Sequence, residues 1–224
     1  SPGPIAALQP TAVLTPSAAV AHSPSLWVLD TNTLMSCLEL LKALFAALLT
    51  RNVAGAAAAG SQQTHLAPSP IKLVIPFVVV SELDGLKLTR RKDDSGRQVA
   101  SQARDANHWL LTAVQKQKRV PIDASGSNLP EQLWPLFLQT SSHYNRSKQS
   151  RSQGSRWTFD DPLSCDDQIV KYCAELKHQT HSSVFFCSDD INARTKAESE
   201  SIDSLGMREL ANSLRTGFAG VQSS

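Results

Sequence analysis

Cysteine is scarce in this chain, and its spacing excludes the common cysteine-based sites. No two cysteines form a CxxC pair, and none stands near histidine at the spacing of a zinc site; the four are Cys37, Cys165, Cys173 and Cys187. Three of them lie in apolar stretches, where cysteine is typically a reduced core residue. Reduced thiols favour an intracellular, reducing compartment.

The chain also lacks a recognisable secretion signal and a long uninterrupted apolar run. Its first residues have neither the basic region nor the continuous apolar core of a signal peptide. The most apolar long segment, residues 34–50, is interrupted by Glu39 and Lys42. It predicts an amphipathic helix that is too short and too charged to span a bilayer, so we expect no membrane association.

Net charge is small, and it selects no partner by itself. Lys and Arg number 22, Asp and Glu number 20, and the formal net charge is +2. Such a balance neither requires nor excludes nucleic acid, so the local placement of charge must decide.

A length of 224 residues accommodates one domain of roughly 150 residues with tails and insertions. Residues 1–24 are rich in Ala, Pro, Ser and Thr and predict a flexible leader or the start of a domain cut from a longer protein. The domain is expected over residues 25–217, followed by a tail at 218–224. Two stretches without apolar periodicity predict insertions, a surface segment at 51–70 and a basic, Ser-rich loop at 141–156.

Short apolar runs alternate with helical patterns along this domain. Thr33 is expected to cap the first helix, and Pro76 to open the second. Alternation of this kind predicts parallel strands joined by right-handed crossovers, in an α/β sandwich of about four or five strands. Strands are expected at 26–29, 73–75 and 184–187, with weaker ones at 120–122 and near Ile202, and further helices at 99–118, 133–138, 166–176, 193–197 and 207–214.

Four acidic residues follow apolar runs, either where a predicted strand ends or in a predicted helix. Carboxyl ends of parallel strands share one edge of a sheet, which is where open α/β folds bind ligands. Carboxylates gathered there repel one another unless a cation lies between them, and all-oxygen ligands select Mg²⁺ or Mn²⁺. The sequence therefore predicts a metal site and phosphoryl chemistry built on Asp30 in WVLDTN, Glu82 in VVSELD, Asp166 in SCDDQI and Asp190 in FFCSDD.

Each acid also has a simpler interpretation. Asp30, Asp166 and Asp190 could each cap the helix that follows, and Glu82 could be a solvated helix residue beside Lys87. The coincidence of four such acids in one chain favours the metal site.

The ordered motifs DTN, ELD, CDDQI and FFCSDDINARTKA resemble those of PIN-domain ribonucleases over about residues 25–200. The resemblance is closest to the eukaryotic PIN endonucleases of messenger-RNA surveillance, which include the nonsense-mediated-decay endonuclease and the nuclear Swt-type endonuclease. The long basic insert before CDDQI is more similar to the Swt type. The resemblance implies a PIN-like three-layer sandwich, a nuclear location, single-stranded RNA as substrate, and partners linked to mRNA export or transcription.

The resemblance also implies roles for individual residues. The four acids named above fall on the family's metal ligands, with Asp167 and Asp189 as alternatives to their neighbours. Asn32 and Ser188 match positions that hold the acids and the metal-associated water. The implied reaction is Mg²⁺- or Mn²⁺-dependent hydrolysis of a phosphodiester, leaving a 5′-phosphate and a 3′-hydroxyl.

Basic side chains flank these motifs and predict a positive rim for RNA phosphates. They could equally be solvated loop charges. A PIN-like scaffold that binds RNA or protein without cutting also remains open. The predicted RNA-binding residues are Arg90, Arg91, Lys92, Arg156, Arg194 and Lys196.

Overall fold

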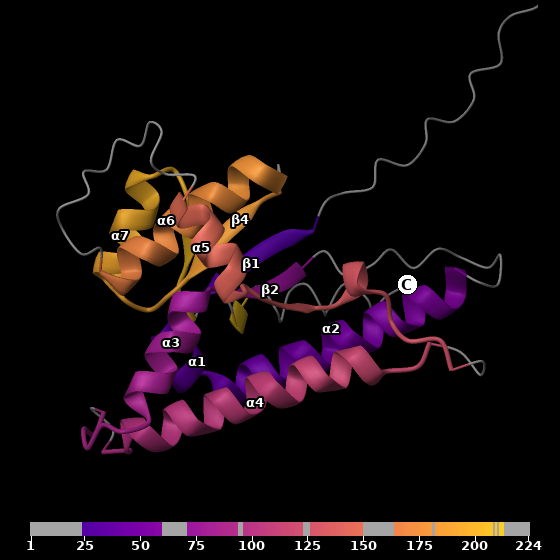
Figure 1. Ribbon diagram of the computed structural model, residues 1–224, viewed down its shortest axis with the longest axis horizontal. Coiled ribbons are helices and arrows are strands. Elements are labelled where there is room, and N and C mark those ends of the chain that lie inside the picture. Colours follow the sequence, from indigo (N-terminus) through magenta and orange to yellow (C-terminus); the bar gives the residue numbers. More distant parts are fainter. Residues whose placement is uncertain are drawn as a thin grey trace, which may run out of the picture.

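The computed structural model describes residues 24–59, 71–93, 96–122, 126–149, 164–180, 182–207, 209, 211 and 212. In these residues five parallel strands form one sheet, in the order β3-β2-β1-β4-β5 (Figure 1). The predicted α/β class with a central parallel sheet is thus confirmed. The predicted tail, and the predicted leader apart from Pro24, lie outside the described residues. The strands are β1 Ser25–Leu29, β2 Ile71–Ile75, β3 Leu136–Leu138, β4 Val184–Cys187 and β5 Asp203–Leu205.

β1 is the central strand of the sheet. Its Val28 pairs in register with Val74 of β2 on one side and with Phe186 of β4 on the other. All three side chains are buried. A strand covered on both faces needs a continuous apolar run instead of an alternating one, which accounts for the composition of β1.

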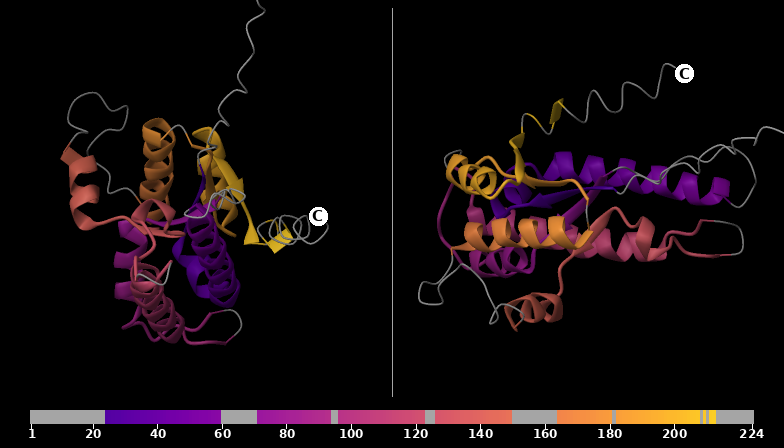
Figure 2. Two further views of the ribbon diagram at one scale, coloured as in Figure 1. Left: turned by 90° about the vertical axis from the view of Figure 1, so that its right-hand side faces the viewer. Right: turned by 90° about the horizontal axis from the view of Figure 1, so that it is seen from above.

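Helices flank the sheet as the alternating pattern predicted. α2 and α4 contact each other and lie side by side in both ribbon views (Figures 1 and 2). α6 packs against β4, and α7 packs against β5. The α-helices of the described residues are α1 Thr31–Ser36, α2 Leu38–Ala59, α3 Phe77–Leu86, α4 Val99–Arg119, α5 Ser141–Gln149, α6 Cys165–Thr180 and α7 Ile191–Ser199.

α2 is longer than the sequence pattern indicated. It has 22 residues, and by length and composition alone it is apolar enough to cross a membrane. The expectation that this segment is too short was therefore wrong for the helix as a whole. One face of α2 is nevertheless buried, and its Phe45 meets Trp109 of α4 edge-on at 6.3 Å between ring centroids. A helix that packs into a protein core passes the same test of composition.

Part of the predicted surface insertion belongs to this helix. Residues 51–59 continue α2 instead of leaving the fold, because Ala-rich sequence has a high helix propensity and needs no apolar period to remain helical. Residues 60–70, the remainder of that prediction, lie outside the described part of the chain.

The predicted helix at 133–138 was wrong. A short 3-10 turn at Glu131–Leu133 is followed by strand β3. Pro135 stops helical propagation, and its carbonyl accepts from the backbone N–H of Leu73 at 2.8 Å, which starts the pairing with β2. The weak strand predicted at 120–122 is an isolated bridge between Pro121 and Asn128.

The predicted loop at 141–156 begins with a helix, α5. Tyr144 anchors this helix, with its ring 5.3 Å from that of Phe77 and its hydroxyl 2.5 Å from Gln168 Oε1 of α6. One aromatic side chain thus attaches an otherwise polar helix to the domain. Residues 150–156 lie outside the described chain.

A buried glutamine of α4 secures the edge strand β3, and its removal should destabilise the fold. Gln117 is 1% exposed, donates to the Leu136 carbonyl at 2.8 Å and accepts from the Leu136 N–H at 3.2 Å. Gln117→Leu keeps most of the volume but leaves both backbone groups unsatisfied, so we expect a loss of about 2–3 kcal/mol in the free energy of unfolding. Urea denaturation measures it.

The matched control is Gln115→Leu, at an exposed position of the same helix. It should change the free energy of unfolding by no more than about 0.5 kcal/mol. Equal losses from the two variants would contradict the role given to Gln117.

Candidate active site at the carboxyl edge of the sheet

The order of strand addition reverses between β1 and β4, which are neighbours in the sheet. Open α/β sheets bind ligands in the crevice outside the carboxyl ends of strands at such a point. Asp30 directly follows β1, and Asp190 lies shortly after β4. Because Leu29 pairs with Cys187 in register, both acids lie at the same edge of the sheet.

Asp30 is buried at this edge, with 3% of its surface exposed. Its Oδ1 caps α1 by accepting from the backbone N–H of Thr33 at 2.6 Å, and its Oδ2 accepts from Ser188 Oγ at 2.5 Å. The capping interpretation is therefore correct for Asp30, and the cap fixes the carboxylate at the end of β1. Thr33 is not the cap that the sequence predicted; its hydroxyl donates to the Cys187 carbonyl at 3.1 Å.

Ser188 joins the ends of the two strands. It is fully buried, and besides donating to Asp30 its Oγ accepts from the backbone N–H of Asp190 at 3.0 Å. The structure thus brings Ser188 to the acids, as the sequence predicted. Asn32, expected to act similarly, is exposed in the first turn of α1, where its backbone carbonyl accepts from Ser36 Oγ.

Glu82 reaches the edge from the middle of α3. Its Oε2 accepts from Thr31 Oγ1 at 2.5 Å and from Cys165 Sγ at 2.9 Å. Thr31 opens α1 and Cys165 opens α6, so one carboxylate oxygen connects three helices. Glu82 is consequently held toward the other acids and is more than a solvated helix residue.

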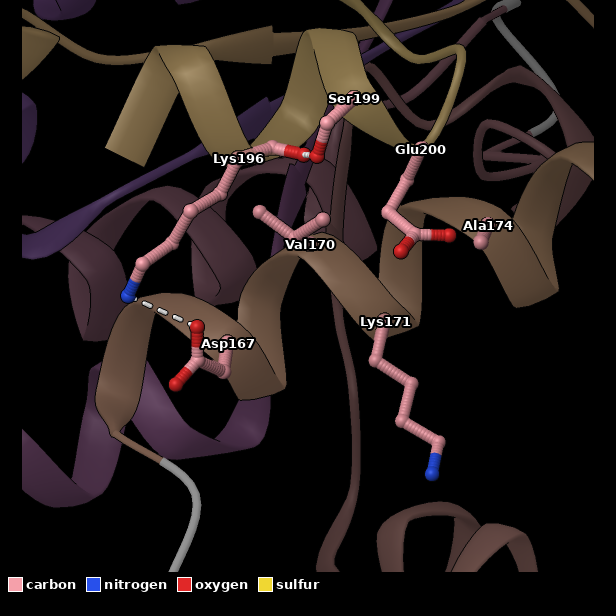
Figure 3. Close-up of a pocket in the computed structure, with 7 residues that line it drawn as sticks. All are labelled: Asp167, Val170, Lys171, Ala174, Lys196, Ser199 and Glu200. Atoms are coloured by element: carbon pink, nitrogen blue, oxygen red, sulfur yellow. Dashed lines mark hydrogen bonds and ion pairs between the residues drawn. The ribbon is translucent and has the colours of Figure 1, made fainter. Parts of the chain in front are cut away.

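The two neighbouring aspartates of α6 have different surroundings. Asp167 forms an ion pair with Lys196 at 2.7 Å (Figure 3). It also accepts from Ser164 Oγ at 2.7 Å, which caps the start of α6. Asp166 instead interacts electrostatically with Asp190, Glu82 and Asp30. The electrostatic coupling favours Asp166 as the member of the acid cluster, and the hydrogen bonds give Asp167 a capping role.

The two aspartates after β4 also differ. Asp190 caps α7, since its Oδ1 accepts from the backbone N–H groups of Asn192 and Ala193 at 2.8 and 3.3 Å. Asp189 turns toward the segment after β5, where its Oδ1 accepts from the Met207 N–H at 2.6 Å. Asp190 is thus the one of the pair that couples to Asp166.

The pKa values of Asp30, Asp166 and Asp167 reflect burial first, and then hydrogen bonds and neighbouring charges. Burial raises the pKa of Asp30, the hydrogen bonds from Ser188 and Thr33 oppose the rise, and Asp166 adds to it. Burial also raises the pKa of Asp166, with Asp190 reinforcing and Lys196 opposing the change. Burial alone would raise the pKa of Asp167, but Lys196 and Ser164 outweigh it and lower that pKa.

The predicted RNA-binding residues fall into separate places. Lys196 lies beside the acids but is paired with Asp167. Arg194 extends toward β5 and the segment after it, where it pairs with Glu209 at 3.0 Å and donates to Ser204 Oγ. Residues 90–92 are exposed in the loop after α3. Arg156 lies outside the described residues.

The acid cluster fits a divalent cation by its donor chemistry. Asp30, Glu82, Asp166 and Asp190 offer carboxylate oxygens at one edge. Burial is the main cause of the raised pKa values of Asp30 and Asp166, and neighbouring carboxylates add a smaller repulsion that a cation would relieve. As the side chains stand, no group of three His, Cys, Asp or Glu residues in the described chain is arranged to hold a metal ion. Asp30 and Glu82 are turned onto hydroxyl, thiol and N–H donors instead.

The chain matches the PIN domain family over residues 27–208, which includes all five strands except the first two residues of β1. It belongs to the PIN-domain family. PIN domains are generally metal-dependent nucleases that typically use divalent ions, in agreement with the acids found here. No curated protein matches the chain.

Three polar residues of this PIN-domain site were missed by reasoning from the sequence. Thr31 and Cys165 donate to Glu82, and Ser164 caps α6 through Asp167. Ser164 could have been found, since Ser-x-x-Asp before an apolar helix is a capping signal. The contacts of Thr31 and Cys165 join segments that are distant in sequence, and no local pattern shows them.

The burial of Asp30 predicts a stability effect that depends on pH. A carboxyl group whose folded-state pKa is raised destabilises the fold once pH exceeds its ordinary value. Asp30→Asn preserves the shape and removes the charge, so the metal-free variant should melt a few degrees above wild type at pH 7. The difference should vanish below about pH 4, where the carboxyl is protonated in both states. Calorimetric melting curves measure it.

Asp84→Asn is the control, because Asp84 forms an exposed pair with Lys87 on the same domain. It should leave the melting temperature nearly unchanged. A lower melting temperature for Asp30→Asn at pH 7 would show that the charged form of Asp30 stabilises the fold.

Proposed function

We propose that this PIN domain is a Mg²⁺- or Mn²⁺-dependent endoribonuclease that hydrolyses phosphodiester bonds of single-stranded RNA. The observation that carries the proposal is that Asp30 and Asp190 follow the two strands at the switch point of the sheet, and that the charges of Asp190 and Glu82 act on Asp166, which in turn acts on Asp30. Divalent ions at such sites supply the Lewis-acid chemistry that activates water and neutralises phosphate charge.

The residues of the chain prepare this chemistry by holding the acids in place. Ser188 contacts both Asp30 and the backbone of Asp190, so the first and fourth acids are tied to one another. Asp30 cannot rotate freely, because each of its oxygens accepts a hydrogen bond. Rigid placement before the substrate arrives is what electrostatic catalysis requires.

The four acids differ in exposure, which indicates the side from which a substrate would approach. Asp30 is buried, Asp166 and Asp190 are half-buried, and Glu82 is exposed. The substrate approaches from the side of Glu82 and Asp166, which are more exposed than Asp30. The exposed basic residues 90–92 lie beyond Glu82 on the same polypeptide segment and supply positive charge for flanking phosphates.

The cellular role rests on the motif resemblance described above. We propose that the protein acts in nuclear messenger-RNA quality control, alongside proteins of mRNA export or transcription. Reduced cysteines agree with an intracellular location, as none of the four forms a disulfide.

Cleavage of unstructured RNA tests the proposed reaction. With Mn²⁺ present, the wild-type protein should cut within the strand of a circular RNA, which has no ends for an exonuclease. Asp30→Asn and Asp166→Asn should each lower the rate by roughly 100-fold or more, because a metal site contributes several kcal/mol to transition-state stabilisation. Gel analysis of end-labelled and circular substrates measures the rates.

Asp84→Asn is again the matched control, since Asp84 is two positions from Glu82 but pairs with Lys87. Asp167→Asn separates the two acids of α6 and should lower the rate less than Asp166→Asn. Equal activity of Asp30→Asn and wild type would refute the catalytic proposal.

A second candidate is a scaffold that binds RNA or protein without cutting. It is favoured by one observation, that the described side chains are not arranged to hold a metal as they stand. Calorimetric titration with Mn²⁺ separates the two candidates. A nuclease binds the ion and loses that binding in Asp30→Asn, whereas a scaffold shows no Mn²⁺ binding and no cleavage.

A further inference from the structure

We infer that Cys165, together with Thr31, is a positioning residue that holds Glu82 in the acid cluster. The inference rests on the proposed function, because it assigns these two side chains a part in preparing the same metal site.

The contact geometry singles out one oxygen of Glu82. Oε2 accepts both described hydrogen bonds, from Thr31 Oγ1 at 2.5 Å and from Cys165 Sγ at 2.9 Å. For Oε1 the structure describes no hydrogen bond among the residues that it covers. Two donors on a single oxygen fix the plane of the carboxylate and leave its other oxygen available to a cation.

Glu82 needs such support more than the other acids do. Asp30 is buried and Asp190 caps a helix through its own short side chain, so their surroundings restrict them. Glu82 lies on an exposed position of α3 and has one more rotatable bond, so an unsupported side chain would populate several rotamers. The partners that orient a metal ligand commonly change metal affinity when they are removed.

Cys165 is distinct among the four thiols of the chain. Cys173 and Cys187 are fully buried in the core. Cys37 is half-buried like Cys165, but its sulfur lies beside Ser36 Oγ at 3.4 Å. Cys165 immediately precedes Asp166, so its bond to Glu82 also ties the start of α6 to α3 and sets the second acid beside the third.

Mn²⁺ titration by calorimetry tests the role with paired substitutions. Cys165→Ala and Thr31→Val each remove a donor to Glu82, and each should raise the Mn²⁺ dissociation constant roughly tenfold. Cys165→Ser and Thr31→Ser retain a hydroxyl donor, and both should stay within about twofold of wild type. Cys37→Ala, the matched control at the other half-buried thiol, should leave Mn²⁺ binding unchanged.

The outcomes separate this inference from the proposed function. If wild type binds Mn²⁺ and Cys165→Ala binds it equally well, the positioning role is wrong while the metal site stands. If Cys165→Ser and Cys165→Ala lose affinity equally, the cysteine acts by packing and not as a donor, which also overturns the inference. If wild type binds no Mn²⁺, the proposed metal-dependent function is wrong, and the positioning role falls with it.

A double-mutant cycle in metal-free buffer tests the contact independently of any ion. The shifts in melting temperature of Cys165→Ala and Glu82→Ala should not add in the double variant, because both substitutions remove the same hydrogen bond. Additive shifts would show that Cys165 and Glu82 are not coupled, and the inference would then fall whatever the protein does with Mn²⁺.

Discussion

The burial of a carboxylate at the end of the central strand is the constraint on which the site depends. Asp30 lies at the carboxyl edge of the sheet, next to the end of β4, and is 3% exposed. A buried charge needs hydrogen-bond donors, and the chain supplies them from the first turn of α1 and from Ser188 after β4. The same contacts that make the carboxylate tolerable also fix where the two strands end and where α1 begins.

Near Asp30, the aspartates that are adjacent in sequence have different roles. In each Asp-Asp pair one carboxylate couples to the cluster, although Asp190 also caps α7. Asp167 is neutralised by Lys196 and closes the start of α6, while Asp189 receives the Met207 N–H beyond β5. Asp166 and Asp190 are left at the edge, where like charges oppose each other. Such an arrangement keeps repulsion at one place in the molecule, where a divalent cation can relieve it.

Reasoning from the sequence succeeded where a physical signal is local. Continuous apolar runs located β1, β2 and β4, and the register of parallel strands then placed their acids at one edge. It failed at β3, where the pattern was interpreted as helical although Pro135 ends any helix there. It also failed at residues 51–59, which are helical although their Ala-rich sequence has no apolar periodicity. Polar contacts between distant segments, such as that of Cys165 with Glu82, cannot be predicted from the sequence of either segment alone.

The central claim is that Asp30, Glu82, Asp166 and Asp190 form one cation site. An anomalous-difference map from a crystal of the wild-type protein soaked in Mn²⁺ tests it most directly. The account predicts a peak at the carboxyl edge of β1 and β4, with oxygens of these carboxylates at roughly 2.0–2.6 Å from the ion. A peak ligated by Asp167 or Asp189 in their place, or no peak at this edge at a saturating concentration, would contradict it.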